Sequence, residues 1–264
     1  MNARNVRPAG IGSLSKEKSM LLHDSNTPAR RAVTALRRTR CALFIGVSVL
    51  FAVGSQFASA AERAYRLQPF SILELDLAAR YVVRNAGAPS ALIRGRPDVV
   101  DRIVVEQHDD RVRIFVPGVL SDAGQIVIEV NTVGLNELDV KGAGEVEARG
   151  FNGPEFSLRM PGAANVNLTA LDVDKLRVEM DGSGNINASG RASSERIRIG
   201  GAGQYHAADL ASDSVEVKIE GVGDVEVMAR ERLEVRLSGA GNVRYRGDPK
   251  VRSHIDGAGT VGRM

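Results

Sequence analysis

The acidic side chains best placed for chemistry are Asp181, Glu220 and Asp256, each of which directly precedes a glycine in a repeated motif. If successive copies of the motif stack about 4.8 Å apart, one layer separates each of these residues from the next, and neighbouring carboxylates lie ~9.6 Å apart. That separation exceeds the spacing in retaining glycosidases and lies at the limit of the inverting range. This spacing makes catalysis by these carboxylates unfavourable, so the sequence favours a protein that is not an enzyme. A polysaccharide lyase or hydrolase is kept as the alternative hypothesis.

Metal and nucleophile chemistry has little support. The histidines after residue 60 are His108, His206 and His254, which belong to different units and have no cysteine or second histidine at ligand spacing. A zinc site or a Ser-His-Asp triad requires such convergence. The only cysteine, Cys41, lies in the N-terminal segment and leaves no thiol for the rest of the chain. We predict no catalytic residue, no metal and no cofactor.

Two glycine-rich segments match ligand-binding motifs only superficially. Residues 257–262 have the spacing GxGxxG, but no helical segment follows, as a dinucleotide-binding motif requires. Residues 200–203 resemble a calcium-binding repeat, but Gln204 follows where an aspartate is needed. Both segments are interpreted as parts of the repeat.

The repeated unit occurs seven times with a period of 18–20 residues. The first glycines of the copies are Gly142, Gly162, Gly182, Gly201, Gly221, Gly239 and Gly257. Positions six, four and two before this glycine, and four and six after it, are mostly apolar; one copy has Val215, Val217, Ile219, Val225 and Val227. Alternation with period two predicts two strands in each copy, each with one buried face.

A G-x-G pair joins the two strands, and we expect its glycines to form structural turns. These glycines are Gly142, Gly144, Gly162, Gly182, Gly184, Gly201, Gly203, Gly221, Gly223, Gly239, Gly241, Gly257 and Gly259. The residue between them is small or modest in size, so we expect the corner to turn inward in every layer. Ala164 replaces the second glycine of one copy, which indicates that a positive φ is not needed there in every layer.

A fixed period of about 20 residues predicts one structural unit stacked on copies of itself. The predicted fold class is all-β, a short right-handed parallel β-helix or solenoid of about seven repeats. The handedness rests on the general preference of parallel crossovers. A β-propeller needs about 40 residues per blade, and an antiparallel sandwich gives no reason for so constant a period.

Residues 61–135 contain short alternating segments, among them Phe70–Leu77, Val99–Val105 and Ile126–Val130. Turn residues at 95–97, 108–110 and 117–118 favour hairpins between such segments. We expect these strands to cap one end of the β-helix of residues 136–264, so that residues 65–264 together form one domain.

The basic character of the chain is concentrated in residues 1–60. The chain has a pI near 9.2, but nine of its 35 Lys and Arg and only two of its 32 Asp and Glu lie there, which leaves 26 basic and 30 acidic residues. Nucleic-acid binding is therefore not expected. Arginines at 30–40, the apolar run 41–54 and Ala58-Ser59-Ala60 predict a signal peptide cut before Ala61, with Met20 as an alternative start. An uncleaved anchor is the alternative, although the run is short for a membrane span.

In a parallel stack, equivalent positions form columns. Three residues after the first glycines stand Glu145, Asn165, Asn185, Gln204, Asp224, Asn242 and Thr260, which we expect to form hydrogen bonds up the stack. Three residues before them stand Asp139, Arg159, Glu179, Arg198, Lys218, Arg236 and His254. The first half of that column alternates in sign, which predicts ion pairs, and the later basic stripe is interpreted as a solvated face.

The opening FSILELDL (Phe70–Leu77), the block Ile103–Val116 and the copies LDVKGAGEVEARGF, LRVEMDGSGNINASG and LEVRLSGAGNVRYRG resemble a known family. It is the family described as putative autotransporter adhesin head, or GIN, domain (DUF2807), and the resemblance covers about residues 66–262. The resemblance implies an adhesin-like β-helical domain of exported bacterial proteins with no established catalytic site.

The expected function is that of an exported, non-enzymatic, adhesin-like module for binding or scaffolding in the bacterial cell envelope. The expected location is the periplasm, the outer-membrane surface or the medium. The expected partner is a protein or glycan ligand of the envelope or cell surface, and not nucleic acid. In the last copy Ser253 and Arg263 replace apolar residues, so an end-to-end homo-oligomer through an uncapped C-terminal rung is also expected.

Overall fold

The computed structural model describes residues 61–120 and 124–264, so the predicted signal peptide of residues 1–60 lies outside the described residues. The described chain forms a sheet of 17 strands and one short helix. The N-terminal elements are β1 (Ala61–Arg66), β2 (Ile72–Asp76), β3 (Ala79–Asn85), β4 (Ser90–Gly95), α1 (Pro97–Val100), β5 (Val104–His108), β6 (Arg111–Phe115) and β7 (Val127–Thr132). The strands that follow are β8 (Glu137–Val140), β9 (Ala143–Arg149), β10 (Asn152–Met160), β11 (Ala163–Met180), β12 (Ser183–Ile199), β13 (Ala202–Ile219), β14 (Val222–Leu237), β15 (Ala240–Arg246), β16 (Lys250–Ile255) and β17 (Ala258–Arg263). No helix in this part of the chain is long and apolar enough to cross a membrane.

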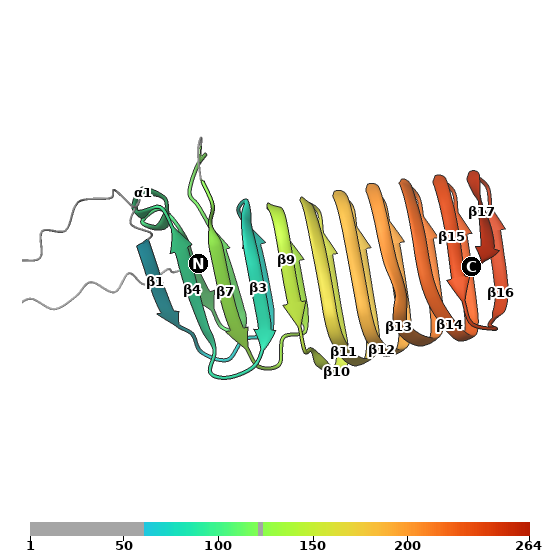
Figure 1. Ribbon diagram of the computed structural model, residues 1–264, viewed down its shortest axis with the longest axis horizontal. Coiled ribbons are helices and arrows are strands. Elements are labelled where there is room, and N and C mark those ends of the chain that lie inside the picture. The colour runs from blue at the N-terminus through green and yellow to red at the C-terminus, as the bar shows by residue number, and fades with distance from the viewer. Residues whose placement is uncertain (1–60, 121–123) are drawn as a thin grey trace, which may run out of the picture. The chain divides into compact units, whose positions relative to one another are not determined.

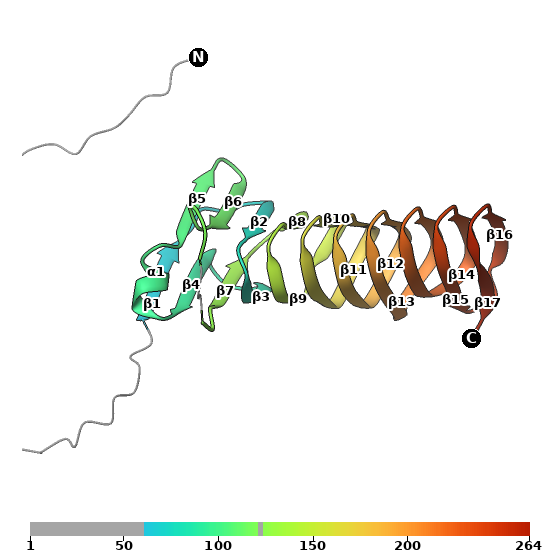
Figure 2. The same ribbon diagram turned by 90° about the horizontal axis from the view of Figure 1, so that it is seen from above.

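Strand pairing sorts the strands into two faces, which we name face A and face B. Face A contains, in spatial order, β5, β6, β2, β8, β10, the C-terminal halves of β11 to β14, and β16. Face B contains β1, β4, β7, β3, β9, the N-terminal halves of β11 to β14, β15 and β17. Figures 1 and 2 show the two faces as opposite walls of one coil.

The repeats form a parallel β-solenoid, as the sequence predicts. Seven corners connect face A to face B, six with the sequence G-x-G and one with Gly162-Ala163-Ala164, and between the corners at Gly142 and Gly257 the chain completes about six turns. The expected number of about seven repeats is therefore corrected, because seven corners bound six complete turns. In Figure 1 the face B strands from β9 onward run downward while the chain advances to the right and returns upward behind them, which makes the coil right-handed (Figures 1 and 2).

The core lies between the two faces and consists of the alternate side chains that point inward. In one layer Val215, Val217 and Ile219 from face A meet Val225 and Val227 from face B, and each is at most 1% exposed. Full burial of such a side chain contributes roughly 1.5–3 kcal/mol. Because the period-two pattern recurs along the repeats, every layer of the stack buries apolar side chains that stabilise the fold.

The corner glycines are required by the close approach of successive layers. A Cβ atom added to Gly221 would lie 2.0 Å from the carbonyl oxygen of Gly201 in the layer before it, a distance no real Cβ tolerates. The same contact is 2.1 Å for Gly162. At the second position, Gly184 has a φ of 133°, which side-chain-bearing residues rarely adopt.

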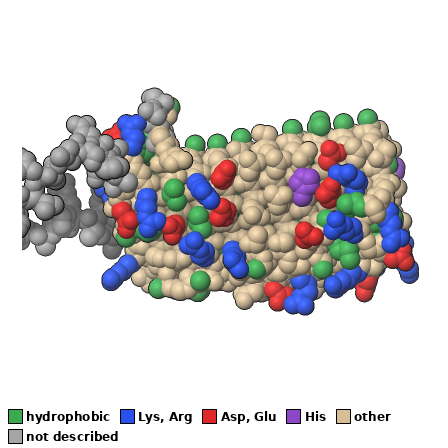
Figure 3. Space-filling model, in the orientation of Figure 1, with side chains coloured by type: hydrophobic (Ala, Val, Ile, Leu, Met, Phe, Trp, Pro, Cys, Tyr) green, Lys and Arg blue, Asp and Glu red, His purple; other side chains and the backbone are tan. Residues whose placement is uncertain are grey.

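The residue between the two glycines points outward, which corrects the expectation of an inward corner. Val222 is 59% exposed, and the equivalent residues form a row of small side chains along one edge of the molecule (Figure 3). The glycines on either side permit the tight bend, so the middle residue is free to face solvent. Its modest size is therefore not imposed by the core.

The N-terminal strands continue the stack and close one end of it. The turn at residues 108–110 makes the predicted hairpin, since β5 and β6 pair antiparallel. The turn at residues 95–97 does not, because α1 follows it and β4 pairs instead with β1 and β7. Proline at the first helical position suits a helix start because its missing N–H would be unpaired there anyway.

The order of the first layers in space differs from their order in the chain. The layer formed by β2 and β3 lies between the layer of β6 and β7 and the layer of β8 and β9. After β1 the chain forms the layer of β2 and β3, then moves outward through β4 to β7 to form the cap, and returns to start the repeats. Strand β2 is consequently paired on both sides by segments distant in sequence.

Candidate functional site

The outward side chains of face A form ion pairs that cross from layer to layer. Arg159 lies 3.7 Å from Glu179 in the next layer, and Arg196 lies 2.9 Å from Glu216. Both pairs are direct neighbours in the parallel register. The alternating charges predicted ion pairs, and the Arg159–Glu179 contact is one of them.

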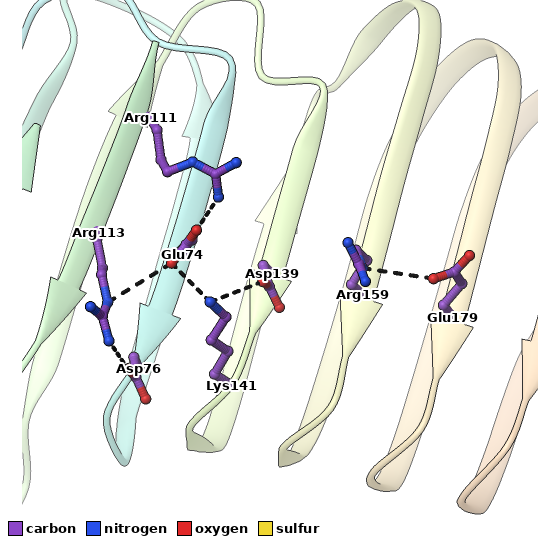
Figure 4. Close-up of polar contacts among 8 residues, drawn as sticks. All are labelled: Glu74, Asp76, Arg111, Arg113, Asp139, Lys141, Arg159 and Glu179. Carbon is purple, nitrogen blue, oxygen red and sulfur yellow. Dashed lines mark hydrogen bonds and ion pairs between the residues drawn. The ribbon is translucent and has the colours of Figure 1, made fainter. Parts of the chain in front are cut away.

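A group of charged side chains on face A surrounds β2 (Figure 4). Glu74 accepts hydrogen bonds from Arg111 and from Lys141 Nζ (2.9 Å), while Arg113 binds Asp76 at 2.5 Å. The side chain of Glu74 is only 9% exposed. Burial favours a raised pKa for Glu74, but the hydrogen bonds from Lys141 and Arg111 outweigh burial and lower that pKa. These contacts link β2 to β6 on one side and to the end of β8 on the other.

Asp139, on β8, completes this group. Its Oδ2 lies 3.4 Å from Lys141 Nζ, and its buried Oδ1 has no hydrogen-bond partner among the described residues. Burial raises the pKa of Asp139, and the attraction of Lys141 offsets only part of that effect. A hollow of about 360 Å³ lies beside these residues. Since its charges already neutralise one another, we interpret the group as structural.

The carboxylates with the predicted spacing are not available as a catalytic pair. Arg198 stands between Asp181 and Glu220 and lies 2.8 Å from an oxygen of each. Asp256 lies 2.9 Å from His254 Nε2. A general acid and a general base need different proton affinities and access to a substrate, whereas Arg198 holds both Asp181 and Glu220 in ion pairs.

The basic stripe of the same column is also paired. Lys218 lies 2.9 Å from Glu220, and Arg236 lies 2.5 Å from Glu234. The cations therefore offer little net positive charge to an anionic ligand. This pairing agrees with the interpretation of the stripe as a solvated face.

The core contains one polar cluster that sequence reasoning missed. Glu195 projects inward from β12, is 2% exposed, and accepts hydrogen bonds from Tyr205 Oη (2.5 Å) and Ser212 Oγ (2.9 Å). Burial raises the pKa of Glu195 to about 7, although both hydrogen bonds oppose the shift. Its neighbours in register are Leu176 and Val215, so a charged residue in an otherwise apolar column was the available signal.

The outward side chains of face B include the predicted amide column. Asn185 donates from Nδ2 to Asn165 Oδ1 (3.1 Å), Asn242 donates to Asp224 Oδ1 (2.9 Å), and Thr260 Oγ1 donates to Asn242 Oδ1 (2.8 Å). The prediction of hydrogen bonds up the stack is confirmed for these pairs. The column is interrupted at Gln204, whose Oε1 lies 3.2 Å from His206 Nε2 in the same layer.

A second polar column runs beside the first on face B. Asn167 and Asn187 are direct neighbours in register and both are exposed. No hydrogen bond of their amide groups is found within residues 61–120 and 124–264. They line a hollow of about 380 Å³ together with Ser189, His206 and Asp209. The middle of this face carries few charged side chains, and charges gather on either side of it (Figure 3).

The remaining histidines do not converge. His108 ends β5 in the cap, and His206 Nδ1 lies 3.2 Å from Glu226 Oε2 on face B. The described residues contain no group of three or more His, Cys, Asp or Glu side chains that could hold a metal ion. Residues 257–262, with the GxGxxG spacing, belong to the last corner and to β17.

The stacked layers, the glycine corners and the two ladder-forming faces define the chain as a parallel β-solenoid. Residues 69–249 match the family described as putative auto-transporter adhesin, head GIN domain, and the chain belongs to that family. No curated protein matches the chain.

Solved structures share the fold. A putative adhesin from Bacteroides fragilis superposes with a TM-score of 0.75 at 22% identity, covering 78% of this chain and 97% of that one. A putative adhesin from Parabacteroides distasonis has a TM-score of 0.59 at 20% identity, with 79% and 98% covered. A protein of the same organism described as a putative lipid binding protein has a TM-score of 0.56 at 17% identity, also with 79% and 98% covered.

Proposed function

We propose that the protein is an exported, non-enzymatic module that binds or scaffolds components of the bacterial cell envelope. The observation that carries the proposal is the adhesin-head family of residues 69–249, on a solenoid whose two broad faces are open to solvent. The envelope location rests on the signal-peptide pattern of residues 1–60.

The alternative of a carbohydrate-active enzyme is disfavoured by the ion pairs of face A. Arg198 binds both Asp181 and Glu220, so a substrate would have to displace a cation held by two carboxylates. A lipid-binding role, suggested by the description of one structural neighbour, is also disfavoured. The solenoid core is filled by its own side chains, and the hollows described above are lined by polar groups.

The test is sedimentation of the full chain with purified outer-membrane vesicles and with peptidoglycan sacculi. We expect saturable binding to at least one of them, without release of new reducing ends. Absence of binding to both would contradict the proposed function. Release of reducing ends at enzymatic rates would favour the enzyme instead, and N-terminal sequencing of the exported protein would show whether its first residue is Ala61.

A further inference from the structure

We propose that the amide columns of face B and the adjoining hollow bind an uncharged polysaccharide that lies along the solenoid axis. This inference rests on the proposed function and names the ligand class of one surface. It starts from Asn167 and Asn187, whose amides face solvent next to the hollow of about 380 Å³ without a hydrogen-bond partner in the described chain. Each amide offers two donors and one acceptor, the combination that vicinal sugar hydroxyls can satisfy.

The spacing of these groups favours a polymer. Asn167 and Asn187 are paired in parallel register, so their side chains repeat at the layer distance of about 4.8 Å. That distance is close to the rise of one hexose in an extended β-1,4-linked chain. A polysaccharide parallel to the axis therefore presents about one sugar to each layer, and because successive β-1,4-linked sugars are turned by about half a revolution, Asn167 and Asn187 would meet opposite edges of neighbouring sugars.

The charges at the two ends of the amide surface set its length. At one end Glu147 is bound by Arg80 (2.7 Å), and at the other His206 lies beside Glu226 (3.2 Å). Three layer spacings separate Glu147 from His206, or ~14 Å, which accommodates about two or three sugars. Between these ends the column carries the neutral amides of Asn167 and Asn187, so the column itself offers a charged polymer no ion pair, and the nearby Arg246 is already paired with Asp209.

The hollow beside Asn187 adds further polar groups to the proposed site. Ser189, His206 and Asp209 line it next to Asn187, and the floor includes Ala188, which is 4% exposed. Asp209 lies 3.5 Å from Arg246 and is otherwise open to solvent. These groups can receive hydroxyls that project sideways from the polymer. Solvent-exposed hydrogen bonds contribute little individually, so we expect weak binding that strengthens when several copies engage one polymer.

The experiment is affinity gel electrophoresis of the full chain in gels that contain one soluble polysaccharide each. Hydroxyethylcellulose and galactomannan have extended β-1,4-linked backbones, dextran and laminarin are neutral with other linkages, and polygalacturonate is anionic. We expect retardation by at least one of the β-1,4-linked polymers and clearly less by the other three. The paired substitution Asn167→Ala and Asn187→Ala should weaken binding at least tenfold, because each amide accounts for about a factor of three to five.

A matched control is Ser194→Ala with Ser214→Ala, two polar neighbours in register on face A. We expect the control to bind within twofold of the unmodified chain, and circular dichroism melting curves should show that both variants fold. Three results would overturn the proposal: no retardation by either β-1,4-linked polymer, equal retardation by dextran or polygalacturonate, or no effect of the Asn167 and Asn187 substitutions.

The sedimentation test separates this inference from the proposed function. If the full chain binds envelope particles and the Asn167→Ala/Asn187→Ala variant binds them equally well, the polysaccharide site is wrong and the envelope role stands. If the polymers are bound through these amides but no envelope particle is, the site stands and the envelope role is wrong.

Discussion

Faces A and B share the long strands β11 to β14 and the corners of the repeats, yet their outward side chains differ in kind. On face A, cations and carboxylates alternate and pair across layers, as Arg159 does with Glu179. On face B, the middle of the surface is occupied by stacked amides such as Asn165 and Asn185. Because both faces share one core, the difference shows that the stack tolerates different chemistry outside while its inward pattern stays constant.

The outward side chains of both faces contribute less to stability than the buried core. Exposed ion pairs contribute about 0–1 kcal/mol each, whereas a single buried Val or Ile contributes roughly 1.5–3 kcal/mol. The surface columns are therefore minor contributors to folding, and the exposed positions are free to vary. Face A uses this freedom to neutralise its charges, and face B leaves hydrogen-bonding groups unpaired.

The largest loss of stability is expected from a substitution at a corner glycine, because each corner connects face A to face B. Gly221→Ala would place a methyl group 2.0 Å from the Gly201 oxygen, so the layers must separate, and we expect a loss of at least about 3 kcal/mol in the free energy of unfolding. Urea unfolding measures the loss. The control is Gly262→Ala, which meets no atom within 4 Å and should change stability by less than about 0.5 kcal/mol. Similar losses in both variants would show that stacking contact is not the reason for the glycine.

The next effect concerns Glu195, which lies between the faces. Its pKa of about 7 in the folded state exceeds the usual 4.5, so the folded protein binds the proton more tightly. The contribution to stability is complete below pH 4.5 and is lost as the pH rises to about 7, by ~3 kcal/mol. Glu195→Gln should remove this slope from stability measured between pH 4 and 8. An unchanged slope would contradict the assignment to Glu195.

The sequence predicted the fold because the signal recurs in every layer. Inward positions such as Val217 and Val225 alternate with period two, and the corner glycines recur every 18–20 residues. The insertion of β2 between β6 and β8 could not be predicted, because the sequence of a parallel strand does not indicate which other strand it pairs with. The direction of Val222 was predicted wrongly, since a small residue between glycines suits an inward or an outward corner equally.

The surface was predictable only in part. The column of Asn165 and Asn185 follows directly from the period, so its hydrogen bonds could be anticipated. The pairing of Arg198 with both Asp181 and Glu220 could not, because these contacts run diagonally between columns. The cluster at Glu195 was visible as a charge in an apolar column, but its partners Tyr205 and Ser212 lie on the following strand.

Glu74 on face A should show the opposite pH dependence to Glu195. Its pKa is lowered, because hydrogen bonds from Lys141 and Arg111 outweigh burial. Its contribution is therefore present above the usual pKa of 4.5 and is lost as the pH falls below it. Glu74→Gln should cost about 2 kcal/mol at pH 7 and should flatten the acid limb of the stability curve. An acid limb that is unchanged in Glu74→Gln would contradict the role of Glu74.

The smallest effects distinguish the two faces by their response to salt. Arg198→Ala removes two exposed ion pairs on face A, and Asn185→Ala removes one amide hydrogen bond on face B. We expect each to cost about 0.5 kcal/mol at low ionic strength. At about 1 M NaCl the Debye length falls to about 3 Å, so the effect of Arg198→Ala should shrink, while that of Asn185→Ala should remain. Urea unfolding at low and high salt measures both effects. Only the Arg198 contacts are between full charges, so an equal salt dependence of the two variants would contradict this difference between face A and face B.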